Sequence, residues 1–417
     1  MSLVGLLAGL GAFFKVRYLF DKAVIDNPVF RLHYSFTSAI FFGSCILTTA
    51  FAFFGKPIDC INDAEGDQLK QAINTFCWIH STYTLDGNYS KLKNTDDAHP
   101  GVGPENNRTE IYHSYYQWVP FVLFLQGILF YAPHWLWKNF EGGRIRQMTD
   151  GSRGMKLGAN GDRKTHCKAL FEYLRQTMRC HRQLVFSYVS CEVINFINVV
   201  GNIFFIDKFL GGVFLKYGTH VIQFANEDQE SRWDPMILTF PRMTKCLFRY
   251  GGKSGGFNEV DSLCLLPLNI VNEKIYIFLW FWLIILAVVT GLNLLYRSAI
   301  FMCPPFRVYL LRRLSSPSLN SSRTVVKRVP IGDYFLLHLL GKNIEGVHFN
   351  ALIDDMATHL SNVPIEVVER RHNFIRQTSE NMADWAAGAV RRASFEDDPM
   401  STTVYLPMQD VKSSSTD

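Results

Sequence analysis

The sequence predicts an all-α membrane protein whose chain crosses the bilayer four times. Three runs of 21 to 23 residues contain no Lys, Arg, Asp or Glu, and a fourth run contains a single acid; they are Tyr34–Phe54, Tyr115–Trp137, Ile275–Tyr296 and Gln183–Ile206. A helix needs roughly 20 apolar residues to cross about 30 Å of hydrocarbon. One such run is compatible with the core of a soluble protein. Four runs, spread along 417 residues that include 34 Phe, exclude that class.

The N-terminal stretch Met1–Phe14 is apolar but too short to span a bilayer. It does not have the pattern of a signal peptide, because no charge precedes it and Lys15 and Arg17 follow it. It is therefore expected to be a buried or pore-inserted helix, or a helix that lies at the membrane interface.

The basic residues near the span ends predict which loops face the cytoplasm. Segment 138–182 holds eleven Lys and Arg against four acids, whereas segment 55–114 holds five against nine acids and segment 207–274 holds eight of each sign. Because basic loops stay on the cytoplasmic side, segment 138–182 and both termini are expected there, and the other two loops face outward. The net charge of +5 then reflects topology, and no nucleic-acid partner is indicated.

These observations divide the chain into nine segments. The C-terminal region after span four is expected to be helical to about residue 360 and increasingly disordered beyond it. Within this region we expect a linker at Leu314–Arg323 and a packed helix at Ile331–Leu340. In order, the segments are an N-terminal pore helix and linker (1–33), span one (34–54), outer loop one (55–114), span two (115–137), a cytoplasmic loop (138–182), span three (183–206), outer loop two (207–274), span four (275–296) and the cytoplasmic C-terminal region (297–417).

Span two carries two prolines. Pro120 lies about one turn in from the outer end, where it predicts a kink that neighbouring helices can accommodate. Pro133 lies beside Trp135 and Trp137, where an aromatic belt and a helix ending are expected at the inner interface.

Cysteine placement indicates two disulfides. Cys60 and Cys77 lie in outer loop one, Cys246 and Cys264 lie in outer loop two, and the other five cysteines lie in spans or on the cytoplasmic side. Even numbers in an oxidising compartment favour disulfides, and three connectivities are open. A zinc site is disfavoured, because no C-x₂₋₄-C pair is present.

Two modification motifs agree with this topology. Asn88 and Asn107 begin N-x-S/T sequons in outer loop one, where glycosylation is possible, whereas the Asn320 sequon lies on the cytoplasmic side and should be silent. Ser394 follows two arginines in the cytoplasmic tail and is a candidate for phosphorylation, which would add up to about two negative charges.

Span three has a polar face formed by Glu192, Asn195, Asn198 and Asn202. At 100° per residue these side chains fall in one arc of about 120°. Because polar groups in hydrocarbon are costly, this face is expected to point into the bundle or toward water. Hydrogen bonding between helices is the preferred interpretation, with pore lining as the alternative.

Nothing in the sequence predicts an enzyme or a cofactor site. The GKS in Arg249–Gly256 lacks the first glycine of a P-loop, since position 247 is Leu, and a flexible turn is expected instead. The histidines have no paired metal spacing, and no nucleophile–base arrangement is present.

Several motifs resemble the innexins, the invertebrate gap-junction proteins. Tyr115, Tyr116, Gln117, Trp118, Val119, Pro120 and Phe121 are similar to the YYQWV signature of that family. The match continues in order from roughly residue 15 to residue 350. The sequence around Lys22–Asn27 is similar to that of insect members of the family. The other matching blocks are Pro57–Cys60, Thr75–Trp78, Phe240–Cys246, Leu266–Lys274 and Ile331–Phe335.

The resemblance implies a subunit of a ring-shaped large-pore channel with a helical cytoplasmic dome and a small disulfide-linked extracellular domain with short strands. By that resemblance, the disulfides are Cys60–Cys264 and Cys77–Cys246. The N-terminal helix, with Met1, Ser2, Leu3 and Val4, would enter the pore, and Lys56 and Asp59 would line the conduit. Expected partners are membrane lipids, six to eight copies in a homo-oligomeric ring, other innexins in a mixed ring, and a ring docked from the apposed cell.

Three functions fit these features to different degrees. The leading hypothesis is an intercellular channel for ions and small metabolites at plasma-membrane gap junctions, with both termini cytoplasmic. Glycans at Asn88 and Asn107 would block docking and favour an unpaired hemichannel, as in the related pannexins. A four-span adhesion protein would share the topology, but it would not explain paired cysteines in both outer loops or the apolar N-terminal helix.

Overall fold

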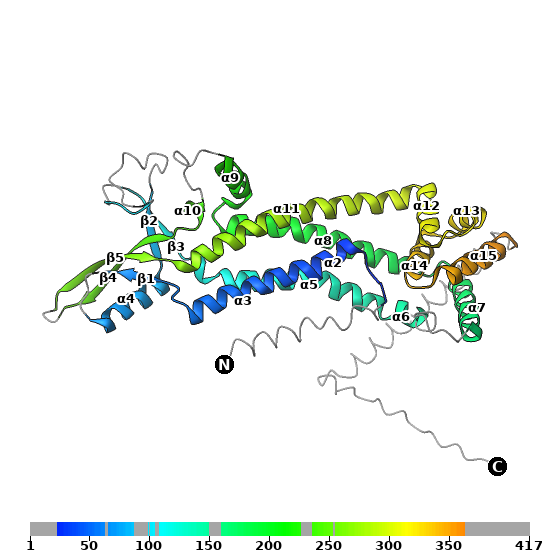
Figure 1. The fold of residues 1–417 in the computed structure, drawn as a ribbon, viewed down its shortest axis with the longest axis horizontal. Helices are drawn as coiled ribbons and strands as arrows, with labels where there is room; N and C mark the ends of the chain where they lie inside the picture. Colours follow the sequence, from blue (N-terminus) through cyan, green and yellow to red (C-terminus); the bar gives the residue numbers. More distant parts are fainter. Residues whose placement is uncertain are drawn as a thin grey trace, which may run out of the picture.

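The computed structural model describes residues 23–62, 66–86, 99, 101–104, 108–149, 160–226, 236–252 and 255–362. The molecule is elongated, with a small sheet at one end, a bundle of long helices in the middle and a group of short helices at the other end, which we call the dome (Figure 1). The predicted Met1–Val4, Asn88, Asn107 and Ser394 positions lie outside the described residues, as does the tail beyond Asn362.

Among the described residues, four helices are long and apolar enough to cross a membrane. The first is a continuous helical segment made of α2 (Pro28–Arg31), a π-helical turn η2 (Leu32–Thr37) and α3 (Ser38–Phe54). The others are α5 (Val119–Glu141), α8 (Arg182–Phe209) and α11 (Pro267–Met302). The first segment and α11 extend six or more residues beyond the charge-free runs, because a helix continues past the hydrocarbon wherever polar residues are solvated.

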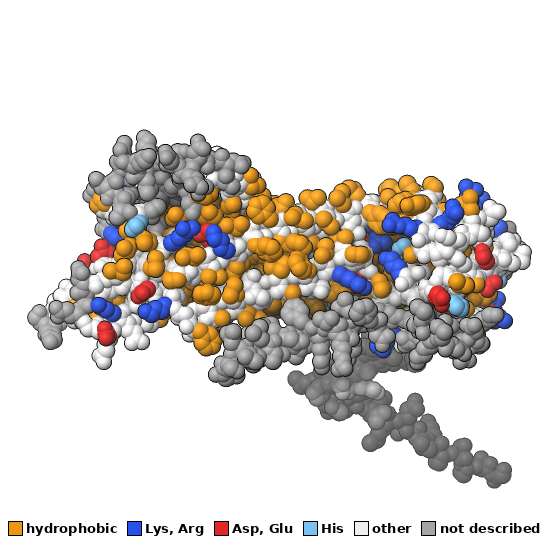
Figure 2. All heavy atoms as spheres, in the orientation of Figure 1, with side chains coloured by type: hydrophobic (Ala, Val, Ile, Leu, Met, Phe, Trp, Pro, Cys, Tyr) orange, Lys and Arg blue, Asp and Glu red, His pale blue; other side chains and the backbone are white. Residues whose placement is uncertain are grey.

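The four long helices pack in a closed order, α3 on α5, α5 on α8, α8 on α11 and α11 on α3. Apolar side chains inside the bundle form one core around Phe41, Phe130 and Leu283. The outer faces of the same helices stay apolar and exposed, as at Phe121, Phe186 and Val288. Figure 2 shows hydrophobic side chains gathered across the middle of the face in view, and an apolar surface of this kind is what a lipid bilayer covers.

The expected kink and ending of the second span are wrong. Helix α5 begins at Val119, so Pro120 occupies the first turn, where its missing N–H costs no hydrogen bond. The helix also continues through Pro133 for two further turns and ends at Gly142, whose left-handed conformation (φ 61°) caps it.

The sheet end contains five strands and is built from both outer loops. The first loop supplies β1 (Asp59–Ile61), β2 (Thr82–Leu85) and β3 (Glu110–His113), with α4 (Asp67–His80) and the short η4 (Tyr115–Gln117). The second loop supplies α9 (Phe214–Asn226), α10 (Met236–Thr239), β4 (Met243–Gly251) and β5 (Phe257–Leu265). Of the turn expected at Arg249–Gly256, Arg249–Gly251 belong to strand β4, and the described residues Gly252, Gly255 and Gly256 lie between β4 and β5.

The dome contains α6 (Arg144–Thr149), α7 (Asn160–Gln176), α12 (Pro304–Ser315), α13 (Leu319–Arg328), α14 (Ile331–Gly341) and α15 (Gly346–Asn362). Its core surrounds α14, where Leu336, Leu337 and Leu340 have no exposed surface. The expected linker Leu314–Arg323 is wrong in extent, because Ser318 caps α13 by accepting a hydrogen bond from the Ser321 N–H at 3.1 Å. Only 316–318 lie between α12 and α13.

Candidate functional site: the disulfide-linked cap and the N-terminal anchor

Strands from the two outer loops form one antiparallel sheet, in which the β4–β5 hairpin of the second loop lies between β1 and β2 of the first. We call this sheet, together with α4, the cap. The strand order is β1-β5-β4-β2-β3, so β1 of the first loop pairs with β5 of the second and β2 pairs with β4 (Figure 1). The ends of all four long helices at this side are therefore joined through a single sheet.

Two disulfides fix this joint between the loops. Cys60 of β1 bonds to its register partner Cys264 of β5, and Cys77 of α4 bonds to Cys246 of β4. These are the pairs that the resemblance implies. All four cysteines are buried, in a core that includes Ile73. Each bond closes a loop of 204 or 169 residues, which in the chain-entropy account stabilises the fold by about 5 kcal/mol for either bond alone.

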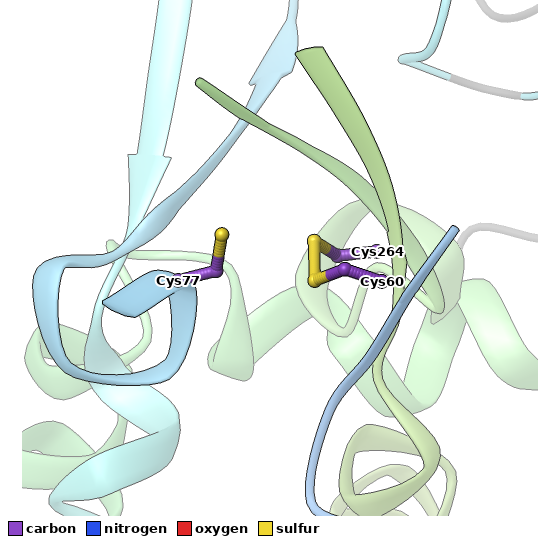
Figure 3. Close-up of side chains that lie close together, drawn as sticks. All are labelled: Cys60, Cys77 and Cys264. Atoms are coloured by element: carbon purple, nitrogen blue, oxygen red, sulfur yellow. A yellow bond between two sulfur atoms is a disulfide. The ribbon is translucent and has the colours of Figure 1, made fainter. Parts of the chain in front are cut away.

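The sulfur atoms of Cys60, Cys77 and Cys264 lie within 4.8 Å of one another. Figure 3 shows Cys77 on its helix to one side of the Cys60–Cys264 bond. Since each of these sulfurs belongs to a disulfide, none offers the thiolate that a metal ion requires. The cluster is therefore a covalent brace between the loops.

The YYQWVPF segment ties the cap to the second long helix. The side-chain amide of Gln117 donates to the carbonyl oxygens of Trp78 and Ile79, and the Tyr116 hydroxyl donates to the carbonyl oxygen of Cys77 at 3.4 Å. These carbonyls belong to the last turn of α4, which has no intrahelical donors for them. The motif therefore caps α4.

The remaining motif residues divide between the core and the surface. The Tyr115 ring packs against Phe240 of the second loop at 5.7 Å between centroids, and Val119 is fully buried. Trp118 and Phe121 are 60% and 68% exposed, so they face outward from the bundle.

The cap also contains a buried histidine. His113 of β3 shares a hydrogen bond of 2.8 Å with the Thr84 hydroxyl of the neighbouring strand. Burial lowers the pKa of His113 to about 4, because an imidazolium loses its hydration there. The neutral ring is the form that the cap accommodates at neutral pH.

Lys56 and Asp59 lie where the first long helix enters the cap, and both side chains are exposed. The adjacent Phe53 and Phe54 at the end of α3 are 80% and 87% exposed. This edge of the subunit therefore presents two charged and two aromatic side chains without cover from the same chain.

At the opposite end of the bundle, residues 23–27 connect the N-terminal segment to the first long helix, and we call this connection the N-terminal anchor. The side chain of Asn343, on the dome, accepts a hydrogen bond from the Val24 N–H at 2.7 Å and donates to the Val24 carbonyl at 2.9 Å. The Trp137 indole N–H donates to the Ile25 carbonyl at 3.1 Å. The dome and α5 therefore both hold the backbone of the anchor.

The side chains of the anchor bind the bundle itself. Asp26 accepts hydrogen bonds from Arg31 Nε at 2.8 Å and from the Tyr34 hydroxyl at 2.9 Å. The Asn27 side chain caps α2 by accepting from the Phe30 N–H, and its amide donates to Glu192 Oε1 of α8 at 2.8 Å. The chain just before the first long helix is therefore held by contacts with the dome, α5 and α8.

Glu192 is the centre of a buried polar cluster. Arg297 of α11 donates to both of its carboxylate oxygens, from Nε at 2.8 Å and from Nη2 at 2.7 Å. Asn293 donates to Glu192 Oε1 at 3.2 Å. The Arg297 guanidinium also lies over the ring of Tyr188, at 5.1 Å from the centroid. The cluster joins α8, α11 and the N-terminal anchor.

The four polar residues of the third long helix have different surroundings. Asn198 donates to the Leu129 carbonyl of α5 at 3.2 Å, and Asn202 donates to Asn198 within α8. Asn195 is buried and has no hydrogen-bond partner among the described residues. Two of the four, Glu192 and Asn198, therefore bond to other helices.

The π-helical turn brings further polar contacts into the bundle. His33 Nε2 lies 2.8 Å from the Thr290 hydroxyl of α11, and the Trp282 indole donates to the Thr37 hydroxyl at 3.0 Å. A π-helical turn adds a residue to the helix and re-aims its side chains, which here places His33 and Thr37 against α11.

Sequence reasoning missed most members of the N-terminal anchor and of the cluster around Glu192. Arg297 directly follows the charge-free run Ile275–Tyr296, and Asn27 precedes a proline, which is a helix-start signal. Those signals mark the residues but do not say that they meet. Asn343 gave no signal, because it lies 319 residues from Val24 in the sequence.

Comparison with known proteins agrees with these features. The innexin family model matches residues 26–360. Innexin inx3 of Drosophila melanogaster is 48% identical over 357 residues, which cover 85% of this chain and 90% of that protein. Innexin inx2 of Schistocerca americana is 44% identical over 346 residues (82% and 94%), and Innexin shaking-B of Drosophila melanogaster is 42% identical over 340 residues (80% and 90%).

Proposed function

Because this chain belongs to the innexin family and is a multi-pass subunit of plasma-membrane gap-junction channels, we propose that six to eight copies form one ring, either alone or mixed with other innexins. Two such rings dock across the gap between cells through their caps, and the joined pore passes ions and small metabolites. The family assignment makes the assembly an oligomeric channel.

The single observation that carries the docking proposal is the covalent joint between the two loops. Two disulfides and a shared five-stranded sheet hold both loops as one rigid unit at one end of the bundle. A rigid surface loses little conformational entropy on association. Disulfides persist outside the cell and not in the cytosol, which supports an outward-facing cap and a cytoplasmic dome.

We assign the pore entrance to the N-terminal segment that precedes the N-terminal anchor, including Met1, Ser2, Leu3 and Val4. Residues 23–27, which follow this segment in the sequence, are fixed by Asn343, Trp137 and Glu192. Lys56 and Asp59 would line the conduit at the opposite end, in agreement with their exposure.

Dye or current passage between two contacting cells that both express this chain tests the proposal. Cys77→Ser leaves Cys246 without its disulfide partner and is expected to abolish coupling. The matched control is Cys180→Ser, which removes an exposed free cysteine of the dome and should leave coupling unchanged. Normal coupling by Cys77→Ser would show that the rigid cap is not needed for docking.

The alternative is a hemichannel that does not dock, and the sequons at Asn88 and Asn107 favour it. In that case single cells would take up dye while contacting pairs would not be coupled. Asn88→Gln together with Asn107→Gln would then restore coupling, because no glycan would separate the two caps. Coupling by the unmodified chain rules this alternative out.

A further inference from the structure

The dome contains a basic groove formed by two adjoining pockets of about 560 and 680 Å³, with Arg307, Val326 and Lys327 lining both. It lies between α12, α13, the start of α14 and the start of α8. Of the described residues that line it, one is an acid, Asp333, and seven are cations. The cations are Arg179, Arg182, Arg307, Arg312, Arg323, Lys327 and Arg328.

The single acid is already engaged. Asp333 accepts a hydrogen bond from the Arg179 N–H at 2.5 Å and lies 2.7 Å from His181 Nδ1. Within the part of the chain that the structure describes, no carboxylate forms an ion pair with Arg307, Arg312 or Lys327. The same is true of Arg182 and Arg323. The groove therefore keeps an excess of positive charge.

This arrangement is costly for the fold itself. Arg323 and Lys327 are exposed and lie one turn apart on α13, where two like charges repel each other and weaken the helix. Arg312 joins them from α12 across the same pocket. A bound anion would convert this repulsion into attraction.

Donors in the groove are also oriented before any ligand arrives. The Arg307 guanidinium lies over the Tyr334 ring at 5.8 Å, and its Nε is buried without a hydrogen-bond partner. Helix α14 begins after Pro330 with no side-chain cap, and its first residues, Ile331, Gly332 and Asp333, line the same groove. Backbone N–H groups at a helix start and a fixed guanidinium are typical phosphate ligands.

The location of the groove indicates where its ligand resides. Pro304 and Pro305, at the start of α12, line it directly after α11 ends at Met302. Pro304 follows the last residue of the charge-free run, Tyr296, by eight positions, or about 12 Å of helix. Figure 2 shows Lys and Arg side chains gathered where the apolar surface ends and the dome begins. A headgroup that projects from the adjacent leaflet reaches this depth.

We propose that the basic groove binds a polyphosphate group of the inositol phosphate class, carried by a lipid of the inner leaflet. Several phosphates are needed to engage cations on α12, α13 and α8 at once, which a lipid with a single phosphate does not offer. Arginine binds phosphate oxygens through two parallel N–H groups. The lipid would hold the dome helices α12 and α13 against the membrane at the end of α11.

The test measures binding of the purified full chain to phosphatidylcholine vesicles that contain phosphatidylinositol bisphosphate. Vesicles with phosphatidylserine at the same total charge are the reference. Arg323→Gln combined with Lys327→Gln should weaken binding about tenfold or more, because charge-assisted hydrogen bonds are lost. The matched control, Arg313→Gln with Lys168→Gln, removes two exposed charges outside the groove and should change binding less than about twofold.

Soluble inositol hexakisphosphate separates the two possible sources of the ligand. Competition by it, together with capture of the bisphosphate vesicles, supports the lipid. Binding of the soluble compound without vesicle capture overturns the lipid source and leaves a free polyphosphate. Equal capture of both vesicle types, equal loss in both variants, or no binding overturns the proposal. Arg312→Gln is the second variant if the first one unfolds at a lower temperature.

This experiment uses detergent-purified protein and requires no channel activity. Its failure therefore leaves the proposed intercellular channel unaffected, whereas loss of cell coupling would leave the groove unaffected. Only the assignment of the lipid to the inner leaflet rests on the proposed orientation of the dome.

Discussion

Replacing Arg297 by Met should destabilise the helix bundle strongly, because it leaves a buried carboxylate without its cation. The side chains of Arg297 and Glu192 are 8% and 2% exposed, and two hydrogen bonds of 2.8 and 2.7 Å join them. After the substitution Glu192 keeps only the neutral amides of Asn27 and Asn293. Breaking one side of a buried ion pair costs about 3–5 kcal/mol.

The assay is thermal unfolding of the detergent-purified ring, followed by the loss of its peak in fluorescence-detected size-exclusion chromatography. At roughly 2–4 °C per kcal/mol, the Tm of Arg297→Met should fall by on the order of 10 °C. Arg313→Met, which removes an exposed arginine of the dome, is the control and should leave the Tm nearly unchanged.

The double variant Glu192→Leu with Arg297→Met separates a buried unpaired charge from a general loss of packing. Removing both ions at once avoids the unpaired carboxylate, so the double variant should be at least about 2 kcal/mol more stable than Arg297→Met. If the double variant is as unstable as Arg297→Met, or less stable, the charge-pair reasoning is refuted and packing around Arg297 explains the loss.

Three further predictions follow from the dome. Asn343→Ala removes both hydrogen bonds to Val24. It should change the voltage dependence or gating of the junctional current in paired-cell recordings, at normal surface expression. Unchanged gating would show that the N-terminal anchor does not influence the pore. Gly332→Ala places a Cβ 2.8–2.9 Å from the backbone of residues 181–182, whereas Gly251→Ala meets nothing within 4 Å. The first should cost about 1–3 kcal/mol in thermal unfolding and the second nearly nothing; equal Tm values would contradict this packing. Burial, with the nearby positive charges of Lys342 and Arg297, lowers the pKa of His338 to about 3. The neutral ring therefore contributes stability that is complete above pH 6.5 and is lost as the pH falls toward 3, by about 2 kcal/mol at pH 5. His338→Phe should make the Tm fall less between pH 7.5 and pH 5, and an unchanged pH dependence would show that His338 is not the group responsible.

Local composition was sufficient to predict the membrane-spanning helices. A charge-free run of 21 or more residues satisfies the length that the bilayer imposes, whatever its neighbours are. The same local reasoning failed for Pro133 and for the linker at Leu314–Arg323. A proline is tolerated when surrounding helices hold the backbone on both sides, and a serine-rich stretch becomes helical when Ser318 caps it. The outcome at Pro133 depends on tertiary contacts that a window of sequence does not contain, whereas the Ser318 cap joins residues three apart and is a local signal that the linker prediction overlooked.

The functional regions were predictable to different degrees. The four outer cysteines were recognisable from their compartment, but residue reasoning alone allowed three pairings, and the family resemblance was needed to choose one. Glu192 was recognised as an acid in an apolar helix, which must have a partner. Its partner Arg297 lies 105 residues away on another helix, and nothing in the periodicity of either helix indicates that they meet.

The sequence by itself determined the number of spans and the cysteines available for disulfides, because both depend on hydrophobicity or redox chemistry that acts locally. The tertiary structure alone decided which distant groups meet. It brought β1 beside β5, Asn343 beside Val24, and the arginines of α8, α12 and α13 into one groove. A polar or charged side chain specifies the kind of partner it needs, whereas helix packing and strand register select which partner lies within reach.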